Sequence, residues 1–341
     1  MSKILPLGES PIIGYQYHAY PLLISSLHPS FYEWFYSNYI QLECSPLVSP
    51  LTFDFYTFEK LNSKSPFLGE MYFLKSMINK YTSPMQFIID ALADEHYIVS
   101  FVDEFYIPNR QAYQRFHNVH DIMIYGFDLT QKIFYVAGYK EDRKFGFTEV
   151  DFDHFEKALL IGASEGSLGQ WADGMHLMKL KLDTSFTLNL NVLVDLMEDY
   201  VHSRNTSMRF RMIQDSKKSI FGIDTFDYVL EYLRQYNGEK LDVRIFHTIY
   251  EHKKTMVSRI RYLRDVTGIE FTPALVNEFV ELENNALIGR NLCLKYELSG
   301  VKQNVKRMAE IYKQIRTKER NLLEAAIHEI KAQLNPINIH N

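Results

Sequence analysis

The spacing of apolar positions divides the chain into a first half that mixes strands with helices and a second half that is almost wholly helical. Between residues 97 and 152, short stretches dense in β-branched and aromatic residues are typical of strands. Helical periodicity precedes and follows them, so we expect an α+β fold in which an antiparallel sheet packs on helices. The predicted strands are 97–107, 121–128, 132–139, 145–152 and 178–183.

The same spacing predicts helices on both sides of a main boundary near residue 170. The stretch 162–174 holds much of the local glycine and serine, and we interpret it as a linker. The expected domains are therefore 1–170 and 171–341. The predicted helices are 20–27, 30–42, 73–79, 84–94 and 151–159 in the first domain, and 189–203, 222–236, 242–264, 272–286 and 301–332 in the second.

The composition is that of an ordinary globular protein, with 46% hydrophobic and 23% charged residues. A net charge of −5 leaves no basic footprint, so we expect no nucleic-acid partner. No stretch has the length of a membrane span, and the first residues lack a signal-peptide pattern, so we expect a cytoplasmic protein without a membrane partner. Cys44 and Cys293 form no paired pattern, which argues against a disulfide framework or a zinc site. We therefore expect no metal.

His120 is the first candidate for chemistry, because it precedes an apolar, strand-like run that stops at Gly126. A histidine at the open end of a strand can be held by its neighbours while one ring nitrogen faces a cleft and acts as a general base. A lone histidine is more often a structural residue whose hydrogen bonds are satisfied. The nucleophile that such a base would activate decides between these interpretations.

The stretches around His120 resemble a known family. His120 is followed by Gly126-Phe127-Asp128 and a hairpin, and it is preceded by "VDEFYIP" at 102–108. This order resembles the histidine segment of papain-like cysteine enzymes of the bacteriocin-processing type, and more narrowly the N-terminal domain of the butirosin biosynthesis protein H family. The resemblance covers roughly residues 12–160. It implies that 1–170 is a papain-like catalytic domain.

In that family the nucleophile is a cysteine that opens a helix near the N-terminus, usually directly after a histidine. The equivalent stretch here is "GYQYHAYPLLISSL" (14–27), in which His18 is followed by Ala19. A helix N-terminus lowers the pKa of a thiol and offers backbone N–H groups to an oxyanion. Alanine keeps that backbone and removes only the sulfur. Three readings stay open: an engineered cysteine-to-alanine change, a naturally inactive relative, or a shifted alignment.

The resemblance implies the remaining site residues as well. The catalytic set is the nucleophile position Ala19, His120 as base and then acid, and Gln16 as a donor to the oxyanion. The family orients its histidine with Asp or Asn where this chain has Gly138, so Tyr139, a backbone carbonyl or a residue elsewhere takes that role. The predicted substrate-binding residues are His18, Asp103, Glu104, Tyr106, His117 and Tyr139, with Asp103 and Glu104 as contacts for an amine.

The resemblance implies an acyltransferase. An acyl group carried as a thioester on an acyl or peptidyl carrier protein would move to a cysteine at position 19 and then to a small-molecule amine. The product would be an amide in natural-product assembly, as in aminoglycoside or nonribosomal peptide pathways. No cofactor is implied, because phosphopantetheine enters only as the arm of the carrier protein. Cys44 follows a predicted helix end, where negative partial charge raises a thiol pKa, so we do not expect it to be the nucleophile.

The helical domain would recognise the substrate or the carrier protein. Its dense stretch at 242–263 offers four candidate contacts to a carrier surface: Arg244, His252, Lys253 and Arg259. Two alternative functions stay open. One is a papain-like peptidase or thioesterase, in which water is the acceptor, and the other is a non-catalytic binding module of the same fold.

Overall fold

The chain forms two compact units in a computed structural model that describes residues 1–45, 51–57, 65–161, 170–209, 219–236, 238 and 240–334. The first unit comprises Met1–Phe31 and Asn62–Ser185, and the second comprises Tyr32–Leu61 and Phe186–Asn341. The fold is α+β, with an antiparallel sheet in the first unit and helices toward the C-terminus, as predicted. None of the described helices is long and apolar enough to cross a membrane.

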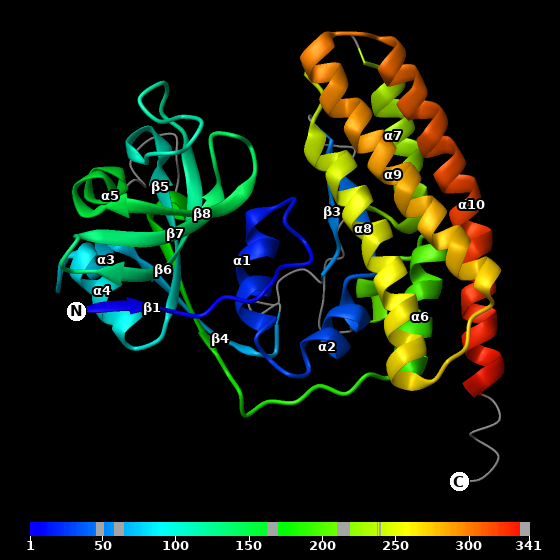
Figure 1. The fold of residues 1–341 in the computed structure, drawn as a ribbon, viewed down its shortest axis with the longest axis horizontal. Coiled ribbons are helices and arrows are strands. Elements are labelled where there is room, and N and C mark those ends of the chain that lie inside the picture. Colours follow the sequence, from blue (N-terminus) through cyan, green and yellow to red (C-terminus); the bar gives the residue numbers. More distant parts are fainter. Residues whose placement is uncertain are drawn as a thin grey trace. The chain divides into compact units, whose positions relative to one another are not determined.

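An antiparallel sheet organises the first unit (Figure 1). Its strands follow the order β4-β9-β5-β6-β7-β8, and β1 pairs with β6 beside β5. Strands β5, β6 and β7 are dense in β-branched and aromatic residues and bury most of their apolar side chains in the core, whereas β8 buries only Val150. The bounds are β1 Ser2–Ile4, β4 Leu68–Leu74, β5 Tyr97–Asp103, β6 Val119–Asp128, β7 Ile133–Tyr139, β8 Phe145–Asp151 and β9 Gly174–Leu180.

Helices pack on this sheet. Helix α1 (Gln16–Ser25) contacts β4 and β9, and α4 (Pro84–Ala93) contacts β5 and β6. Proline at the first position of α4 suits a helix start, because its missing N–H has no intrahelical role there. The short helices are α3 (Lys75–Ile78), α5 (Phe152–Ala158) and the 3₁₀ turns η1 (Glu104–Tyr106) and η2 (Gln170–Asp173).

Gly126 lets β1 lie directly against β6. A Cβ atom at this position would stand 2.7 Å from the carbonyl oxygen of Lys3 and 3.0 Å from Cα of Ile4. The register between β6 and β7 also shifts between Ile124 and Gly126. Glycine is therefore required here by the close approach of another backbone.

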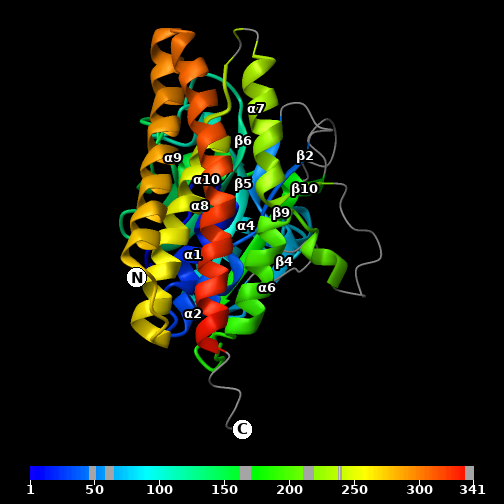
Figure 2. The ribbon, with the colours of Figure 1, turned by 90° about the vertical axis from the view of Figure 1, so that its right-hand side faces the viewer.

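Long helices form most of the second unit. Helix α9 lies beside both α8 and α10, and the three run side by side in Figures 1 and 2. A small sheet of order β10-β2-β3 contacts α8 through β3. The bounds are α2 Phe31–Asn38, β2 Leu42–Ser45, β3 Thr52–Phe55, α6 Leu190–Val201, η3 Thr206–Arg209, β10 Ile220–Phe221, η4 Gly222–Asp224, α7 Thr225–Arg234, α8 Val243–Tyr262, the π-turn η5 Leu263–Thr267, α9 Pro273–Ser299 and α10 Gln303–Leu334.

Two buried side chains of α8 bind the backbone that follows α2. The Arg259 guanidinium donates to the carbonyl oxygens of Tyr36 and Tyr39 at 2.7 and 2.6 Å. His252 Nε2 lies 2.8 Å from the carbonyl oxygen of Ile40. These carbonyls lie at and just beyond the end of α2, where a helix leaves acceptors without intrahelical partners. These hydrogen bonds hold the end of α2 against α8, which follows about two hundred residues later in the sequence.

The two compact units differ from the ranges 1–170 and 171–341 predicted from the sequence. Strand β9 pairs with β4 and β5, so the first unit extends to Ser185. The segment 32–61 joins the second unit because β2 pairs with β10 and α8 binds the end of α2. Of the predicted linker, residues 162–169 lie outside the described residues, and the remainder forms η2 and the start of β9.

Candidate functional site

The site lies where α1 begins beside the first residues of β6. Gln16 is the first residue of α1, and His120 and Asp121 follow Val119 at the start of β6. Tyr20, one turn along α1, donates its hydroxyl to the carbonyl oxygen of Asp121 at 3.2 Å. Helix α1 and strand β6 are therefore joined at Asp121.

Asp121 orients the imidazole of His120. Its Oδ1 lies 2.7 Å from His120 Nδ1. A carboxylate oxygen can only accept a hydrogen bond, so Nδ1 carries the hydrogen. In the neutral ring, Nε2 then holds the lone pair, and the His120 side chain is 45% exposed. This is the arrangement of a general base whose tautomer is fixed by a neighbouring carboxylate.

The amide of Gln16 completes the network around Asp121. Gln16 Oε1 accepts from the backbone N–H of Tyr139 at 2.7 Å, which fixes which end of the amide faces β6. Nε2 then donates to the carbonyl oxygen of Asp121 at 2.7 Å and lies 3.1 Å from its Oδ1. Gln16 Nε2 is also 3.1 Å from His120 Nδ1. Since both nitrogens carry hydrogens in this tautomer, that last distance is a contact rather than a hydrogen bond.

The surroundings of His120 favour its charged form. Partial burial lowers the pKa of His120, but the hydrogen bond and charge of Asp121 outweigh it, with the charge of Glu104 adding to them. The pKa of His120 therefore lies above its ordinary value. A reaction that needs the neutral ring should speed up as the pH rises through that pKa.

Asp121→Asn should lower the pKa of His120, because asparagine keeps the shape of the side chain and removes its charge. The rising limb of the rate against pH should move to lower pH. The maximal rate should fall, because the amide no longer fixes one tautomer. Titration of the His120 ring protons by NMR measures the first effect, and an unchanged titration would show that Asp121 does not control this histidine.

Two predicted site residues in α1 are completely buried. His18 and Ala19 are both 0% exposed, and the His18 ring packs against Tyr17 with centroids 4.7 Å apart. Gln16, one turn before Ala19, is the residue of α1 that contacts His120. This geometry favours the third reading, a shifted alignment, because it is position 16 and not position 19 that stands beside His120. Ala19 as the nucleophile position stays a prediction.

Cysteine substitutions distinguish positions 16 and 19. Gln16→Cys places a thiol at a helix N-terminus beside His120, both of which lower a thiol pKa. Position 16 is 5% exposed and position 19 is 0% exposed, so the expected difference rests on the contact with His120: we expect Gln16→Cys to react with iodoacetamide at least tenfold faster than Ala19→Cys. Burial raises the pKa of both Cys44 and Cys293 to about 12, so the background should be slow. Intact-protein mass against time gives the rates, and a faster Ala19→Cys would restore the original alignment.

The predicted amine contacts are bonded within their own loop. Asp103 Oδ1 accepts from the backbone N–H groups of Phe105 and Asn118, and Oδ2 lies 2.6 Å from His117 Nδ1. Glu104 Oε2 accepts from the Asn118 side chain at 2.7 Å. These bonds build the turn between β5 and β6. Because the carboxylates of Asp103 and Glu104 already accept these hydrogen bonds, fewer of their lone pairs are left to bind the substrate amine that the sequence analysis expected there.

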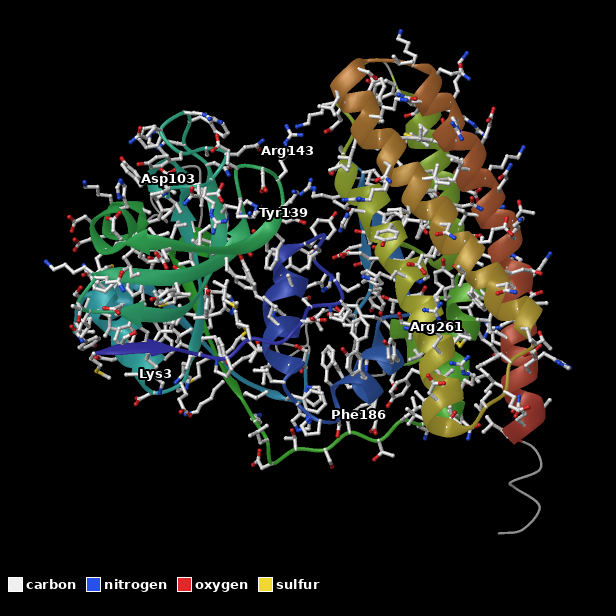
Figure 3. All side chains as sticks on the ribbon, in the orientation of Figure 1. Lys3, Asp103, Tyr139, Arg143, Phe186 and Arg261 are labelled. Atoms are coloured by element: carbon white, nitrogen blue, oxygen red, sulfur yellow. The ribbon has the colours of Figure 1, made fainter. Side chains whose placement is uncertain are left out.

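The other predicted binding residues differ in their exposure and in their contacts. The His117 side chain is 67% exposed and its ring stacks on Phe105, with centroids 4.5 Å apart. The Tyr106 ring packs edge-on against Phe105. Tyr139 takes part through its backbone, while its hydroxyl donates to the carbonyl oxygen of Ile13 at 2.6 Å. Figure 3 shows Asp103 and Tyr139 toward the upper part of the first unit, at the ends of β5 and β7.

Sequence reasoning missed Asp121, the residue that orients His120. Neighbouring residues of a strand point to opposite faces, so a carboxylate next to the histidine was not considered. In the structure the two side chains nevertheless meet, with Asp121 Oδ1 2.7 Å from His120 Nδ1. The acid-histidine pair "HD" at a strand start was the available signal.

The candidate contacts for a carrier protein in α8 are mostly inaccessible. His252, Lys253 and Arg259 are each 1% exposed or less, so the prediction that they meet a partner surface is wrong. Helical periodicity shows on which face of a helix a charged residue lies. It does not show whether another segment of the chain covers that face. Arg244 is exposed and forms a two-pronged ion pair with Asp242.

A surface pocket of about 570 Å³ lies away from the site residues, between β4, β9 and the end of α4. Its lining includes His96, Lys181 and Leu182, and none of the predicted site residues. Among the described residues, no group of three or more histidine, cysteine or acidic side chains is placed to hold a metal ion. Comparison with models of known protein families and with curated proteins gave no match for this chain.

Proposed function

We propose that the chain is an amide-forming acyltransferase in which His120 is the general base and no residue of the chain carries the acyl group. The observation that supports this most directly is the Asp121 carboxylate on Nδ1, which leaves the Nε2 lone pair on an exposed ring. Among the described residues, the hydrogen-bond partner of His120 is Asp121, at Nδ1, and no side chain is hydrogen-bonded to Nε2. No thiol or hydroxyl of the described residues is therefore bonded to the basic nitrogen, and in this proposal the nucleophile comes with the substrate.

The donor in this proposal is a thioester on an acyl or peptidyl carrier protein, and the acceptor is a small-molecule amine. The amine nitrogen attacks the thioester carbonyl while His120 Nε2 takes one of its protons. The C–S bond then breaks, and the imidazolium returns the proton to the departing sulfur. One N–C bond forms, one C–S bond breaks, and His120 ends unchanged.

The choice of acyl chemistry rests on the sequence resemblance around residues 102–128. The residues around His120 support a different mechanism for the same proposed product. Cys44 and Cys293 are buried in the second unit with raised pKa values, and Gln16 stands beside His120. Direct transfer therefore replaces the acyl-cysteine intermediate. Natural-product assembly remains the setting that the resemblance suggests.

Hydrolysis of the thioester is the second candidate, and the exposure of His120 favours it. The side chain is 45% exposed, so water can reach the ring. The two reactions share the donor, the base and the leaving thiol. They differ only in the acceptor.

One assay separates the candidates. The protein is incubated with an acylated carrier protein, with and without a panel of primary amines, and free thiol, amide and free acid are followed by mass spectrometry. The proposal expects amide that depends on both the protein and the amine. Free acid alone would support hydrolysis. Stable complex formation without thiol release would make the chain a binding module.

A further inference from the structure

Arg110 is a buried cation next to the site that the sequence analysis did not single out. Its side chain is 1% exposed, and Nη1 donates to the carbonyl oxygen of Tyr139 at 2.6 Å. Nε lies 4.0 Å from Glu104 Oε1. Nη2 is buried without a hydrogen-bond partner among the described residues. Burying a guanidinium with an unpaired donor lowers the free energy of unfolding. Packing alone therefore does not explain why an arginine stands here.

The backbone of Tyr139 connects Arg110 to His120. Its carbonyl oxygen accepts from Arg110, and its N–H donates to Gln16 Oε1. Gln16 Nε2 in turn donates to Asp121, which holds His120. Arg110 and Gln16 thus bind the two peptide groups on either side of the Tyr139 Cα, and Gln16 contacts the His120–Asp121 pair.

Gly138 makes this arrangement possible. A Cβ atom there would lie 2.9 and 3.1 Å from Arg110 Nη2 and Nη1, and 3.1 Å from Gln16 Oε1. The resemblance places the orienting Asp or Asn of the family at this position. Here the space next to the backbone is taken by Arg110 and Gln16 instead, and Asp121 orients the histidine.

Arg110 also balances the charges around His120. The groups facing His120 are Asp121 from β6, Glu104 from η1, and Gln16 and Tyr20 from α1. Burial raises the pKa of Tyr20 well above its ordinary value, so it stays neutral. Two carboxylates therefore act on His120, and Arg110 is the cation that lies near both.

We propose that Arg110 is a positioning residue of this site: it fixes the backbone of Tyr139, which holds Gln16 against Asp121, and its charge offsets Asp121 and Glu104. Without it, the two carboxylates would keep His120 protonated to higher pH and so remove the base at neutral pH. The catalytic consequence rests on the proposed function. The effect on His120 itself does not, and it can be measured without a substrate.

The test is an NMR titration of the His120 ring protons in the full-length protein, assigned by the signals lost in His120→Gln. In Arg110→Met we expect the pKa of His120 to rise by about one pH unit, because the cation and the fixed amide are both lost. Arg110→Lys keeps the charge and should return the titration most of the way to wild type. Arg115→Met removes an exposed charge from the same loop and should leave it unchanged.

Folding of Arg110→Met is checked by its amide spectrum. If that variant does not fold, Gly138→Ala replaces it, because the added Cβ must displace Arg110 and Gln16 while the charge stays in the chain. It should raise the pKa of His120 in the same direction. A folded Arg110→Met or Gly138→Ala whose His120 titrates as in wild type overturns the proposal, and Arg110 is then structural only. This outcome is independent of whether amide forms.

Discussion

Replacing His120 by glutamine is expected to lower the rate constant of amide formation by about 10²–10⁴-fold, the range for loss of a positioned general base. Glutamine fills similar space and can still bond Asp121, so the fold and the affinity for the acylated carrier protein should be retained. The loss should therefore lie in kcat, with KM for the donor little changed. Initial rates at saturating amine measure it.

The matched control for this variant is His154→Gln. His154 is also paired with an aspartate through Nδ1, at 2.5 Å from Asp151, but it sits at the start of α5 and its Nε2 faces Tyr113. Its replacement should change the rate by no more than a few-fold. Equal losses in the two variants would mean that the substitutions act through stability. An active His120→Gln would remove His120 from the mechanism.

The largest effect on stability is expected in the second unit, where a buried ion pair joins α8 to α10. Lys253 Nζ donates to Glu319 Oε1 at 2.5 Å and to the Tyr200 hydroxyl at 3.1 Å. Both charged side chains are 1% exposed. Burial lowers the pKa of Lys253, and Glu319 opposes that effect. Lys253→Met leaves Glu319 buried without its cation, so we expect the free energy of unfolding to fall by about 3–5 kcal/mol.

Denaturant unfolding with a second substitution shows the cause. Glu319→Gln keeps an acceptor for Tyr200, whose hydroxyl lies 3.1 Å from Oε2, and removes the unpaired charge. The double variant Lys253→Met with Glu319→Gln should therefore lose less stability than Lys253→Met alone. Lys318→Met breaks an exposed ion pair between α10 and Glu281 of α9 and should cost less than about 1 kcal/mol. Additive losses in the double variant would contradict this account.

Local periodicity predicts much of this fold. The strands that became β5 to β8 follow from runs of β-branched and aromatic residues, and α4 follows from Ser83-Pro84 before an apolar helical pattern. Strand β4 was missed and its end was read as helix, because "FLKSMIN" suits either structure as a short apolar run. Short apolar runs carry too little periodicity to decide.

The division into units depends on contacts that no local pattern contains. Residues 32–61 belong with helices that follow residue 186, because Arg259 and His252 bind the carbonyls near the end of α2. In the sequence, Arg259 and His252 are polar positions of a predicted helix, and such positions predict an exposed face. Only the structure shows the segment that covers them.

The site was predictable in part. His120 and Gln16 were both singled out, and the structure brings them together at the start of α1. Asp121 and Arg110 were not found, because one lies next to His120 in a strand and the other acts through the backbone of Tyr139. A sequence motif identifies side chains at a fixed spacing. The contacts that orient His120 come instead from the adjacent Asp121, from the backbone of Tyr139 and from Arg110, a buried loop residue.

The central claim is that the acyl group passes directly to the amine without first binding the chain. The most direct measurement is the intact-protein mass during a single turnover of acylated carrier protein, sampled by rapid quench while amide is formed. We predict that the chain keeps its unmodified mass throughout, and that amide forms about 10²–10⁴-fold more slowly in His120→Gln. An acyl adduct that appears and decays at the rate of product formation would contradict it, and would require a nucleophile on the chain.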